Sequence, residues 1–279
     1  MLKTRVVTAL VLLALIIPML VWLPPSGWAL FVGLFVVAGA WEWGRLAGLE
    51  GAGRIVYPAV IAAVIGALLA LDAAAGSLGT LLHVAAIALW LGLVPLWLAR
   101  RVKLPGGWLS CAIGALFLVS CWIAVWQARE LGILYLLVLL AVVWVADIAA
   151  YFSGRAFGRR KLAPSISPGK TWEGVVGGQA GVLLFATACA LVVGLAPNFF
   201  ADGLATGGWA LVLLSAVVLA ASSVVGDLFE SLLKRERGQK DSSGLLPGHG
   251  GVLDRIDALI PSMPLAMLIA AATGMNRAG

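Results

Sequence analysis

Three aspartates near the carboxyl end of the chain have the chemistry and spacing of cation ligands. Asp254 and Asp257 lie three residues apart, as do Asp227 and Glu230, so each pair shares one face if the segment is helical. Asp147 adds an acid inside a strongly apolar segment, where an ionisable side chain is costly and usually functional. Oxygen ligands without cysteine sulfur favour Mg²⁺ over zinc. We therefore predict a metal site formed by Asp227, Asp254 and Asp257.

The same acids have an alternative role in salt bridges at the membrane surface. Basic residues lie in nearby segments and would be their partners: Arg155, Lys234, Arg235 and Arg255. Ion pairs of this kind need no metal. The sequence alone leaves both interpretations open.

A polar loop at 165–174 is a candidate phosphate site. It contains Gly-Lys-Thr, but a Walker A motif needs glycine five positions before Gly169, and that position is Pro164. The loop still leads into a predicted helix at 174–195, whose first N–H groups suit an anion. We predict that its hydroxyls and its cation bind substrate phosphate: Ser167, Lys170 and Thr171.

A second loop, at 240–251, is rich in glycine and strengthens this interpretation. Gly248, Gly250 and Gly251 allow backbone amides to approach a phosphate chain closely. His249 between them has the chemistry to donate a hydrogen bond to phosphate or to transfer a proton.

The elements that must position these residues are membrane helices. Of the 279 residues, 62% are hydrophobic and 11% are charged, and the mean hydropathy is +1.05. Soluble domains carry about 25% charged residues. Apolar runs of spanning length predict an all-α, polytopic bundle of about nine transmembrane helices. We place them at 5–23, 28–47, 55–71, 79–99, 108–127, 132–153, 174–195, 207–229 and 256–273.

The distribution of lysine and arginine predicts the orientation of these helices. With the amino terminus in the cytoplasm, nearly all basic loop residues lie inside, and only Arg129 and Arg277 lie outside. The carboxyl terminus is then outside, and both polar loops face the cytoplasm. This pattern is that of a multi-pass protein of a bacterial-type inner membrane. Nucleic acid is not an expected partner, because the basic residues lie in short loops between spans.

The chain reads as one membrane domain, 1–279, with amino-terminal helices in 1–130 and the catalytic helices and loops in 131–279. Cys111 and Cys121 are too far apart along one predicted helix to form a disulfide. His83 reads as a satisfied core residue. Overlapping Gly-x-x-x-Gly patterns at 174–181 predict close helix packing, and glycine-rich faces make a homodimer plausible.

The polar motifs resemble those of a known family. The run from Ser231 to Asp257, with Lys-Arg, Lys-Asp, Pro-Gly-His-Gly-Gly and Asp-Arg-x-Asp, is similar to the signature of phosphatidate cytidylyltransferases, also called CDP-diacylglycerol synthases. Asp147-x-x-Ala-Tyr151, Gly226-Asp-Leu228 and the segments 158–164 and 167–174 also match. The resemblance is strong over 145–258, and the first half matches mainly in hydropathy. Ile148-Ala149 departs from the small hydroxyl residue and glycine that the family usually carries, so no hydroxyl role is assigned there.

The resemblance implies a reaction and roles for the residues. CTP and phosphatidic acid would give CDP-diacylglycerol and pyrophosphate with Mg²⁺, in phospholipid biosynthesis. The resemblance also allows a second cation, including a monovalent one, beside Mg²⁺. Asp227 and Asp254 would be the metal ligands, with Asp257 and Asp147 supporting them. The phosphates would be neutralised by Lys170, Lys234, Arg235, Lys240 and Arg255, and the nucleotide cradled by Gly248, His249, Gly250 and Gly251.

Three other functions compete with this one. A transporter would spread its acids through the membrane depth, whereas these acids gather on one side with basic glycine loops. A CTP-dependent polyprenol kinase would transfer the γ-phosphoryl group instead, and labelled CTP distinguishes the two enzymes. A lipid scaffold without catalysis would leave many costly polar residues without a role.

Overall fold

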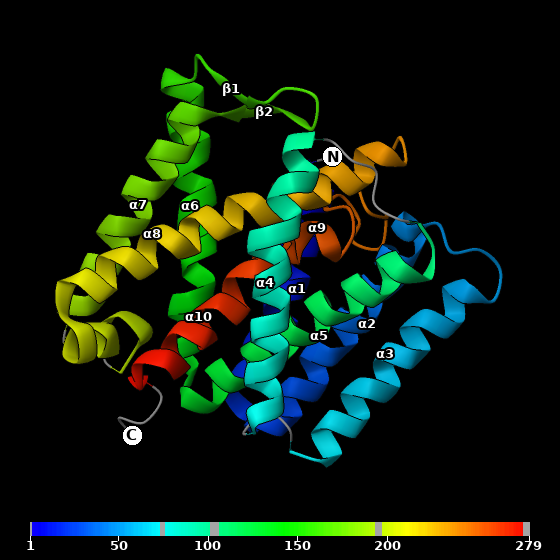
Figure 1. Cartoon of the computed structure of the whole chain (residues 1–279), viewed down its shortest axis with the longest axis horizontal. Helices are drawn as coiled ribbons and strands as arrows, with labels where there is room; N and C mark the ends of the chain where they lie inside the picture. The colour runs from blue at the N-terminus through cyan, green and yellow to red at the C-terminus, as the bar shows by residue number, and fades with distance from the viewer. Residues whose placement is uncertain (1, 73–75, 101–105, 193–196, 276–279) are drawn as a thin grey trace.

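Long apolar helices make up almost all of the structure, a computed structural model that describes residues 2–72, 76–100, 106–192 and 197–275 (Figure 1). Lys3, Arg5, Arg101, Lys103 and Arg277, which contribute to the predicted orientation, have side chains outside this description. In chain order the helices are α1 (Leu2–Trp22), α2 (Pro25–Ala47), α3 (Gly53–Ala70), α4 (Ser77–Arg100), α5 (Trp108–Leu131), α6 (Ile133–Phe157), α7 (Trp172–Leu191), α8 (Phe199–Glu236), α9 (Leu253–Ile256) and α10 (Leu259–Thr273).

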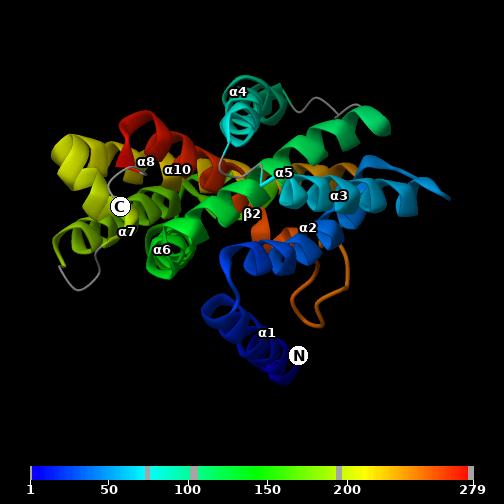
Figure 2. The same ribbon diagram turned by 90° about the horizontal axis from the view of Figure 1, so that it is seen from below.

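The helices confirm a polytopic membrane bundle. Within the described residues, eight segments are long and apolar enough to cross a membrane, the last of them comprising α9 and α10 together. The first predicted span is the helix α1, whose apolar part, Val6–Trp22, is shorter. Figure 2 shows α1 standing apart from the other helices, and it packs only lightly on α2. Helices from both halves of the chain pack together, as the contacts of α10 with α4 and α5 show.

Helix α8 is much longer than the predicted 207–229. The side chain of Asn198 caps its start by accepting hydrogen bonds from the N–H groups of Phe200 and Ala201. Gly208 then kinks the helix with a φ of 65°. At the other end, buried Leu232 and Leu233 continue the apolar face as far as Glu236. The predicted span 207–229 is therefore too short at both ends, and Asp227 and Glu230 lie within the last turns of α8.

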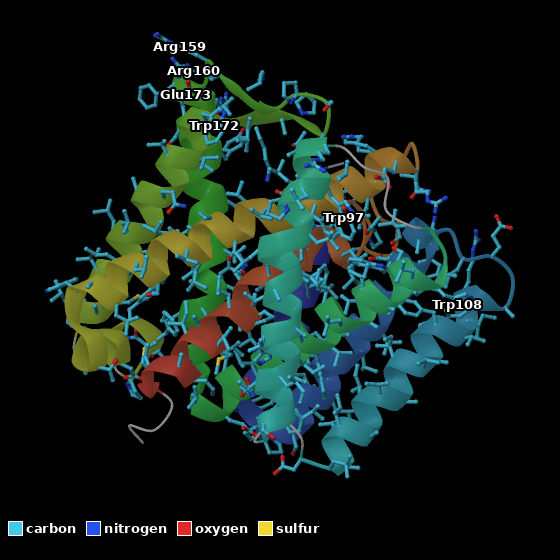
Figure 3. The ribbon with its side chains drawn as sticks, viewed as in Figure 1. Trp97, Trp108, Arg159, Arg160, Trp172 and Glu173 are labelled. Atoms are coloured by element: carbon cyan, nitrogen blue, oxygen red, sulfur yellow. The ribbon has the colours of Figure 1, made fainter. Side chains whose placement is uncertain are left out.

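The segment 165–174 is not a simple loop. Strands β1 (Lys161–Ala163) and β2 (Ser167–Thr171) form an antiparallel hairpin between α6 and α7. The backbone N–H of Arg160 donates to both carboxylate oxygens of Glu173 at 3.2 Å. Arg159, Arg160 and Glu173 gather at the base of the hairpin, where α6 ends and α7 begins (Figure 3). The hairpin fixes the direction in which β2 presents its side chains.

The glycine pattern at 174–181 packs α7 closely on α6, as predicted. A Cβ on Gly174 would lie 3.0 Å from the carbonyl oxygen of Ala150, and one on Gly178 would lie 3.0 Å from that of Ala146. A Cβ on Gly181 would meet Ala149 at 2.6 Å, so the small residue at that departure from the family pattern has a packing role. These contacts bring the first turn of α7 beside the last two turns of α6.

An aromatic cluster fixes α8 against α2, α4 and α5. The ring of Phe229 stacks on Trp97 at 5.9 Å and meets Trp90 edge-on at 5.2 Å. Trp43 and Phe117 complete the cluster. Each such aromatic pair contributes about 1 kcal/mol beyond its buried area. Because Phe229 lies between Asp227 and Glu230 in sequence, this packing also sets the orientation of both acids.

Two smaller predictions are confirmed. Cys111, Cys121 and Cys189 are all free and buried. The ring of His83 is satisfied on both nitrogens, by the hydroxyl of Ser120 at 2.8 Å and by Gln127 at 2.9 Å.

Candidate active site

A cavity of about 470 Å³ lies between α6, α7 and α8, with β2 at its polar end. Asp147, Lys170 and Asp227 line this end, and small residues such as Ala146 and Gly178 form an apolar wall. Polar groups that converge in an otherwise apolar cavity are typical of a ligand site. With Thr171, which also lines the cavity, the structure therefore brings together four of the predicted site residues.

Asp227 is accessible within this cavity. Its side chain is 30% exposed, and its Oδ2 pairs with Nζ of Lys170 at 2.6 Å. Its Oδ1 accepts a longer hydrogen bond, 3.3 Å, from the hydroxyl of Ser231 one turn further along α8. An ion pair that water reaches contributes only about 0–1 kcal/mol. A phosphate or a cation can therefore replace these contacts at little cost.

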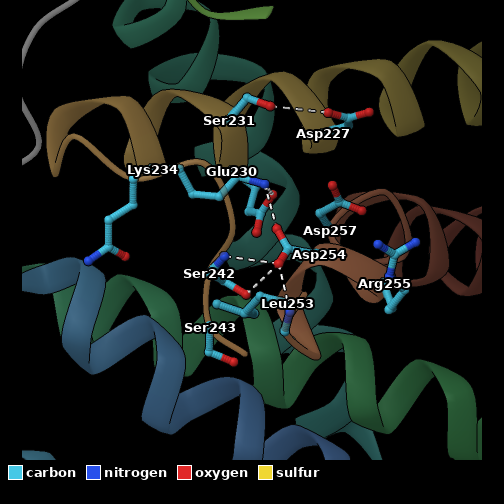
Figure 4. Close-up of polar contacts among 12 residues, drawn as sticks. Asp227, Glu230, Ser231, Lys234, Ser242, Ser243, Leu253, Asp254, Arg255 and Asp257 are labelled. Carbon is cyan, nitrogen blue, oxygen red and sulfur yellow. Dashed lines mark hydrogen bonds and ion pairs between the residues drawn. The ribbon is translucent and has the colours of Figure 1, made fainter. Parts of the chain in front are cut away.

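Asp254 lies in the short α9, and neighbouring residues of the protein occupy both oxygens of its carboxylate (Figure 4). Its Oδ1 pairs with Nζ of Lys234 at 2.6 Å, and its side chain is 7% exposed. Its Oδ2 accepts hydrogen bonds from the N–H of Ser242 at 2.9 Å, the hydroxyl of Ser242 at 2.9 Å and the N–H of Gly251 at 2.8 Å. Lys234 also pairs with Glu230, which is 3% exposed. Asp254 thus organises the loop before it.

The structure contains no preformed three-acid metal centre in the part of the chain that it describes. Asp257 lies close enough to Asp227 for their charges to interact, and its Oδ1 accepts the N–H of Ala258 at 2.8 Å. Asp227 and Asp254 are each paired with a lysine, which is the alternative that the sequence left open. Their role as metal ligands stays a prediction.

The glycines of the second loop serve close approach to Asp254. Gly248 and Gly250 have positive φ angles of 76° and 80°. A Cβ on Gly250 would lie 2.6 Å from Oδ2 of Asp254. The amide of Gly251 is directed at Asp254 and is not free for a phosphate.

His249 lies at the tip of this turn. Its carbonyl oxygen accepts hydrogen bonds from the guanidinium of Arg255, which fixes the backbone at this point. Its Nδ1 is buried and has no hydrogen-bond partner within the described residues. The imidazole thus has one unused hydrogen-bonding position, which is shielded from the surface.

Of the other predicted residues, one lines the cavity and the rest lie outside it. Thr171 lines the cavity, and its hydroxyl oxygen caps α7 by accepting the N–H of Gly174 at 3.1 Å. Arg235 donates to the carbonyl oxygens of Ile166 and Gln239, so it braces the hairpin. Ser167 pairs with Ala163 in the hairpin and does not line the cavity, and Lys240 is exposed.

Sequence reasoning gave no role to several residues that shape the site. Ser242 and Ser243 lie inside the signature, but their hydroxyls were not singled out. Glu42 of α2 is fully buried and meets this loop. The sequence shows this acid near the end of the second predicted span, where metal binding and ion pairing were equally open to it.

Comparisons with known proteins find relatives along nearly the whole chain. The model of the cytidylyltransferase family matches residues 3–273. A phosphatidate cytidylyltransferase of Pseudomonas aeruginosa is 44% identical over 98% of this chain and 99% of its own length. Those of Haemophilus influenzae and Brucella melitensis are 37% and 38% identical, over 95% and 97% of this chain and 96% and 93% of their own lengths.

Proposed function

This chain belongs to the cytidylyltransferase family, and we propose that its active site spans the cavity at Asp227 and the loop at Asp254. The enzyme makes CDP-diacylglycerol from CTP and phosphatidate, as its near full-length similarity to phosphatidate cytidylyltransferases supports. The observation that carries the location is the pairing of an accessible carboxylate with a lysine at the polar end of an apolar cavity.

The reaction needs little acid–base chemistry. A phosphate oxygen of phosphatidate attacks the α-phosphorus of CTP, and a new P–O bond forms. The bond from that phosphorus to the oxygen bridging the α- and β-phosphates breaks, and its electron pair leaves with pyrophosphate. Because the nucleophile is already anionic, no strong general base is required. Catalysis rests on alignment of the two substrates and on neutralisation of phosphate charge.

The cavity suits the lipid substrate. Its small apolar residues, with Val224 of α8, offer a surface for acyl chains near the headgroup, and Arg155 stands near the polar end with Tyr151. Lys170 would exchange its pairing with Asp227 for the phosphate of the lipid. The exchange would leave neither charge unpaired. Lys170 would pair with the lipid phosphate, and Asp227 would face a cation bound alone or with the nucleotide.

The loop at 240–251 suits the nucleotide. Arg255 and Lys240 are exposed beside the glycine turn, and Nδ1 of His249 has no partner among the described residues. Arg255 and Lys240 would contact the triphosphate, and a rotation of the imidazole would turn Nδ1 of His249 toward it. Asp254 would hold the loop backbone in place. Lys234 lies between Glu230 and Asp254 and would act mainly through them.

The donor set fits Mg²⁺ when phosphate oxygens complete its coordination. Mg²⁺ is usually held by one or two carboxylates together with substrate phosphates and water, so a three-acid centre is not needed. Asp227 would hold the ion, with Asp257 and Asp147 nearby, whereas Asp254 would have to give up hydrogen bonds to do so. When bound, the cation supplies positive charge that stabilises the transferring phosphate. The same proposal includes a second cation, which can be monovalent, beside Mg²⁺.

The multi-pass enzyme belongs in a bacterial inner membrane, and we propose that its site faces the cytoplasm, where CTP is made. A homodimer stays a prediction. The glycines of α7 that suggested one are used against α6 of the same chain, so they give no separate support for a dimer.

An assay with labelled CTP tests the proposed function. Purified enzyme in lipid, supplied with phosphatidate and Mg²⁺, should incorporate label from the α-phosphate of CTP into lipid and none from the γ-phosphate. In a parallel reaction supplied with polyprenol, a polyprenol kinase would give the reverse. Chelation of Mg²⁺ should abolish incorporation, and persistence of full activity after chelation would contradict the metal proposal.

A further inference from the structure

Glu42, near the end of α2, is a carboxylate with no exposed surface. It lies in the first half of the chain, far in sequence from the polar motifs of the second half. No ion pair joins it to a lysine or arginine in the part of the chain that the structure describes. A buried charge of this kind is tolerated only if hydrogen-bond donors satisfy it. The identity of those donors therefore indicates what Glu42 does.

The four donors lie at the two ends of the segment 242–253, which contains the glycine turn. Oε2 accepts the N–H of Leu253 at 2.7 Å and the hydroxyl of Ser242 at 3.2 Å. Oε1 accepts the N–H of Val252 at 3.0 Å and the hydroxyl of Ser243. One carboxylate thus joins residues 242–243 to residues 252–253, and the turn with Gly248 and Gly250 projects between them.

Glu42 and Asp254 act on the loop together. The hydroxyl oxygen of Ser242 lies 2.9 Å from Oδ2 of Asp254 and 3.2 Å from Oε2 of Glu42. Because a hydroxyl has one proton, it serves one carboxylate at a time and couples the two. A Cβ on Gly251 would overlap both the Ser242 hydroxyl and the Glu42 carboxylate, so only glycine fits at this point.

The helix that carries Glu42 is itself tied to α8. The guanidinium of Arg237 donates from Nε to the carbonyl oxygen of Leu46 at 2.7 Å, and it lies against Gly48 at the end of α2. Trp43, next to Glu42, packs against Phe229 of α8. Glu42 therefore acts from a support that is fixed relative to Asp227.

We infer that Glu42 is a positioning residue for the nucleotide, which holds the ends of the loop 242–253 together so that Asp254, Arg255 and the glycine turn keep their places. This inference rests on the proposed function. Phosphatidate, bound at the Lys170 end of the cavity, is not positioned by Glu42. The two substrates should therefore respond differently when the carboxylate is altered.

The test is Glu42→Gln in the full-length chain, purified in lipid. The amide keeps the shape of the side chain but turns two N–H donors toward groups that are donors themselves. We expect the KM for CTP to rise about 10-fold and kcat to fall, with the KM for phosphatidate unchanged. Loss of folded protein would instead lower the apparent kcat and leave both KM values at the wild-type level, which would overturn the inference. Glu50→Gln, at an exposed site beyond the same helix, is the matched control and should be silent.

Hydrogen exchange of the loop gives a readout that does not depend on activity. Amides within 242–253 should exchange faster in Glu42→Gln than in the wild type or in Glu50→Gln. Ser243→Ala removes one donor to Glu42 and also the acceptor of the Leu245 N–H, so the amides of Val252 and Leu253 are the ones to compare. They should exchange faster but less so than in Glu42→Gln, which covers the case in which Glu42→Gln folds poorly. Unchanged exchange in both variants would overturn the role of Glu42 alone, whereas a wild-type enzyme without cytidylyl transfer would overturn the proposed function.

Discussion

Two aspartates of the proposed site are held in opposite ways. Asp227 is 30% exposed and has one lysine and one distant hydroxyl as partners. Asp254 is 7% exposed and accepts an ion pair and three further hydrogen bonds. The contacts of Asp227 exchange readily for a ligand, whereas those of Asp254 cannot change without disturbing the loop. The difference separates ligand binding at Asp227 from loop organisation at Asp254.

The partners of the two acids also come from different parts of the structure. Lys170 reaches Asp227 from a hairpin outside the helical bundle. The partners of Asp254 come from α8 and from the loop that Glu42 closes. Substitutions at the two acids should therefore lower activity for different reasons, and stability measurements should separate them.

Asp254→Asn should have the largest effect. The amide would leave Lys234 without one of its two carboxylates and would oppose loop donors with its own N–H groups, and breaking a buried pair costs about 3–5 kcal/mol. We expect turnover to be abolished and the unfolding temperature to fall, with membrane insertion intact. Activity and thermal unfolding of the purified variant measure both effects. Near-normal turnover would exclude Asp254 from the site.

Asp227→Asn should lower activity about 10²–10³-fold, as expected for one lost electrostatic contact in the transition state. The unfolding temperature should stay at the wild-type value, because the pair with Lys170 is partly solvated. Titration with Mg²⁺ should show a weaker apparent affinity than in the wild type. A variant with unchanged Mg²⁺ dependence would show that Asp227 does not hold the cation.

Lys170→Met should have a smaller effect and act on one substrate. It removes the cation that we place on the phosphate of the lipid and keeps most of the side-chain volume. We expect the KM for phosphatidate to rise about 10-fold, as loss of a charged hydrogen bond predicts. The KM for CTP should not change. Equal changes in both KM values would contradict separate positions for lipid and nucleotide.

The membrane bundle could be predicted because hydropathy alone decides which segments cross a bilayer. The ends of the helices could not. Buried Leu232 and Leu233 extend α8 through Lys234, although charge at that position suggested a loop. The hairpin at 161–171 also escaped prediction, since its strands are short and are stabilised by pairing with each other more than by an apolar pattern.

The site could be predicted as a set of residues but not as an arrangement. Motif spacing identified the residues on α8, on the two loops and on α6. It could not show that Asp227 shares a cavity with Asp147 and Lys170, while the amides of Ser242 and Gly251 turn toward Asp254. Nor could it bring Glu42 to the loop, because that contact joins residues about two hundred positions apart.

Two serines give the smallest and sharpest test of the difference between the acids. Ser231 offers Asp227 a single partly solvated hydrogen bond of 3.3 Å, so Ser231→Ala should change kcat/KM by no more than about 2–3-fold. Ser242 is fully buried and its hydroxyl is shared by Asp254 and Glu42, so Ser242→Ala removes a donor on which two buried carboxylates depend. A loss of about 10-fold or more is expected there, with faster hydrogen exchange in the loop. The two substitutions remove the same atom from the same residue type, so steady-state kinetics on the pair compares the clusters directly. Equal effects would mean that Asp254 is no more dependent on its surroundings than Asp227, and the proposed division between them would fail.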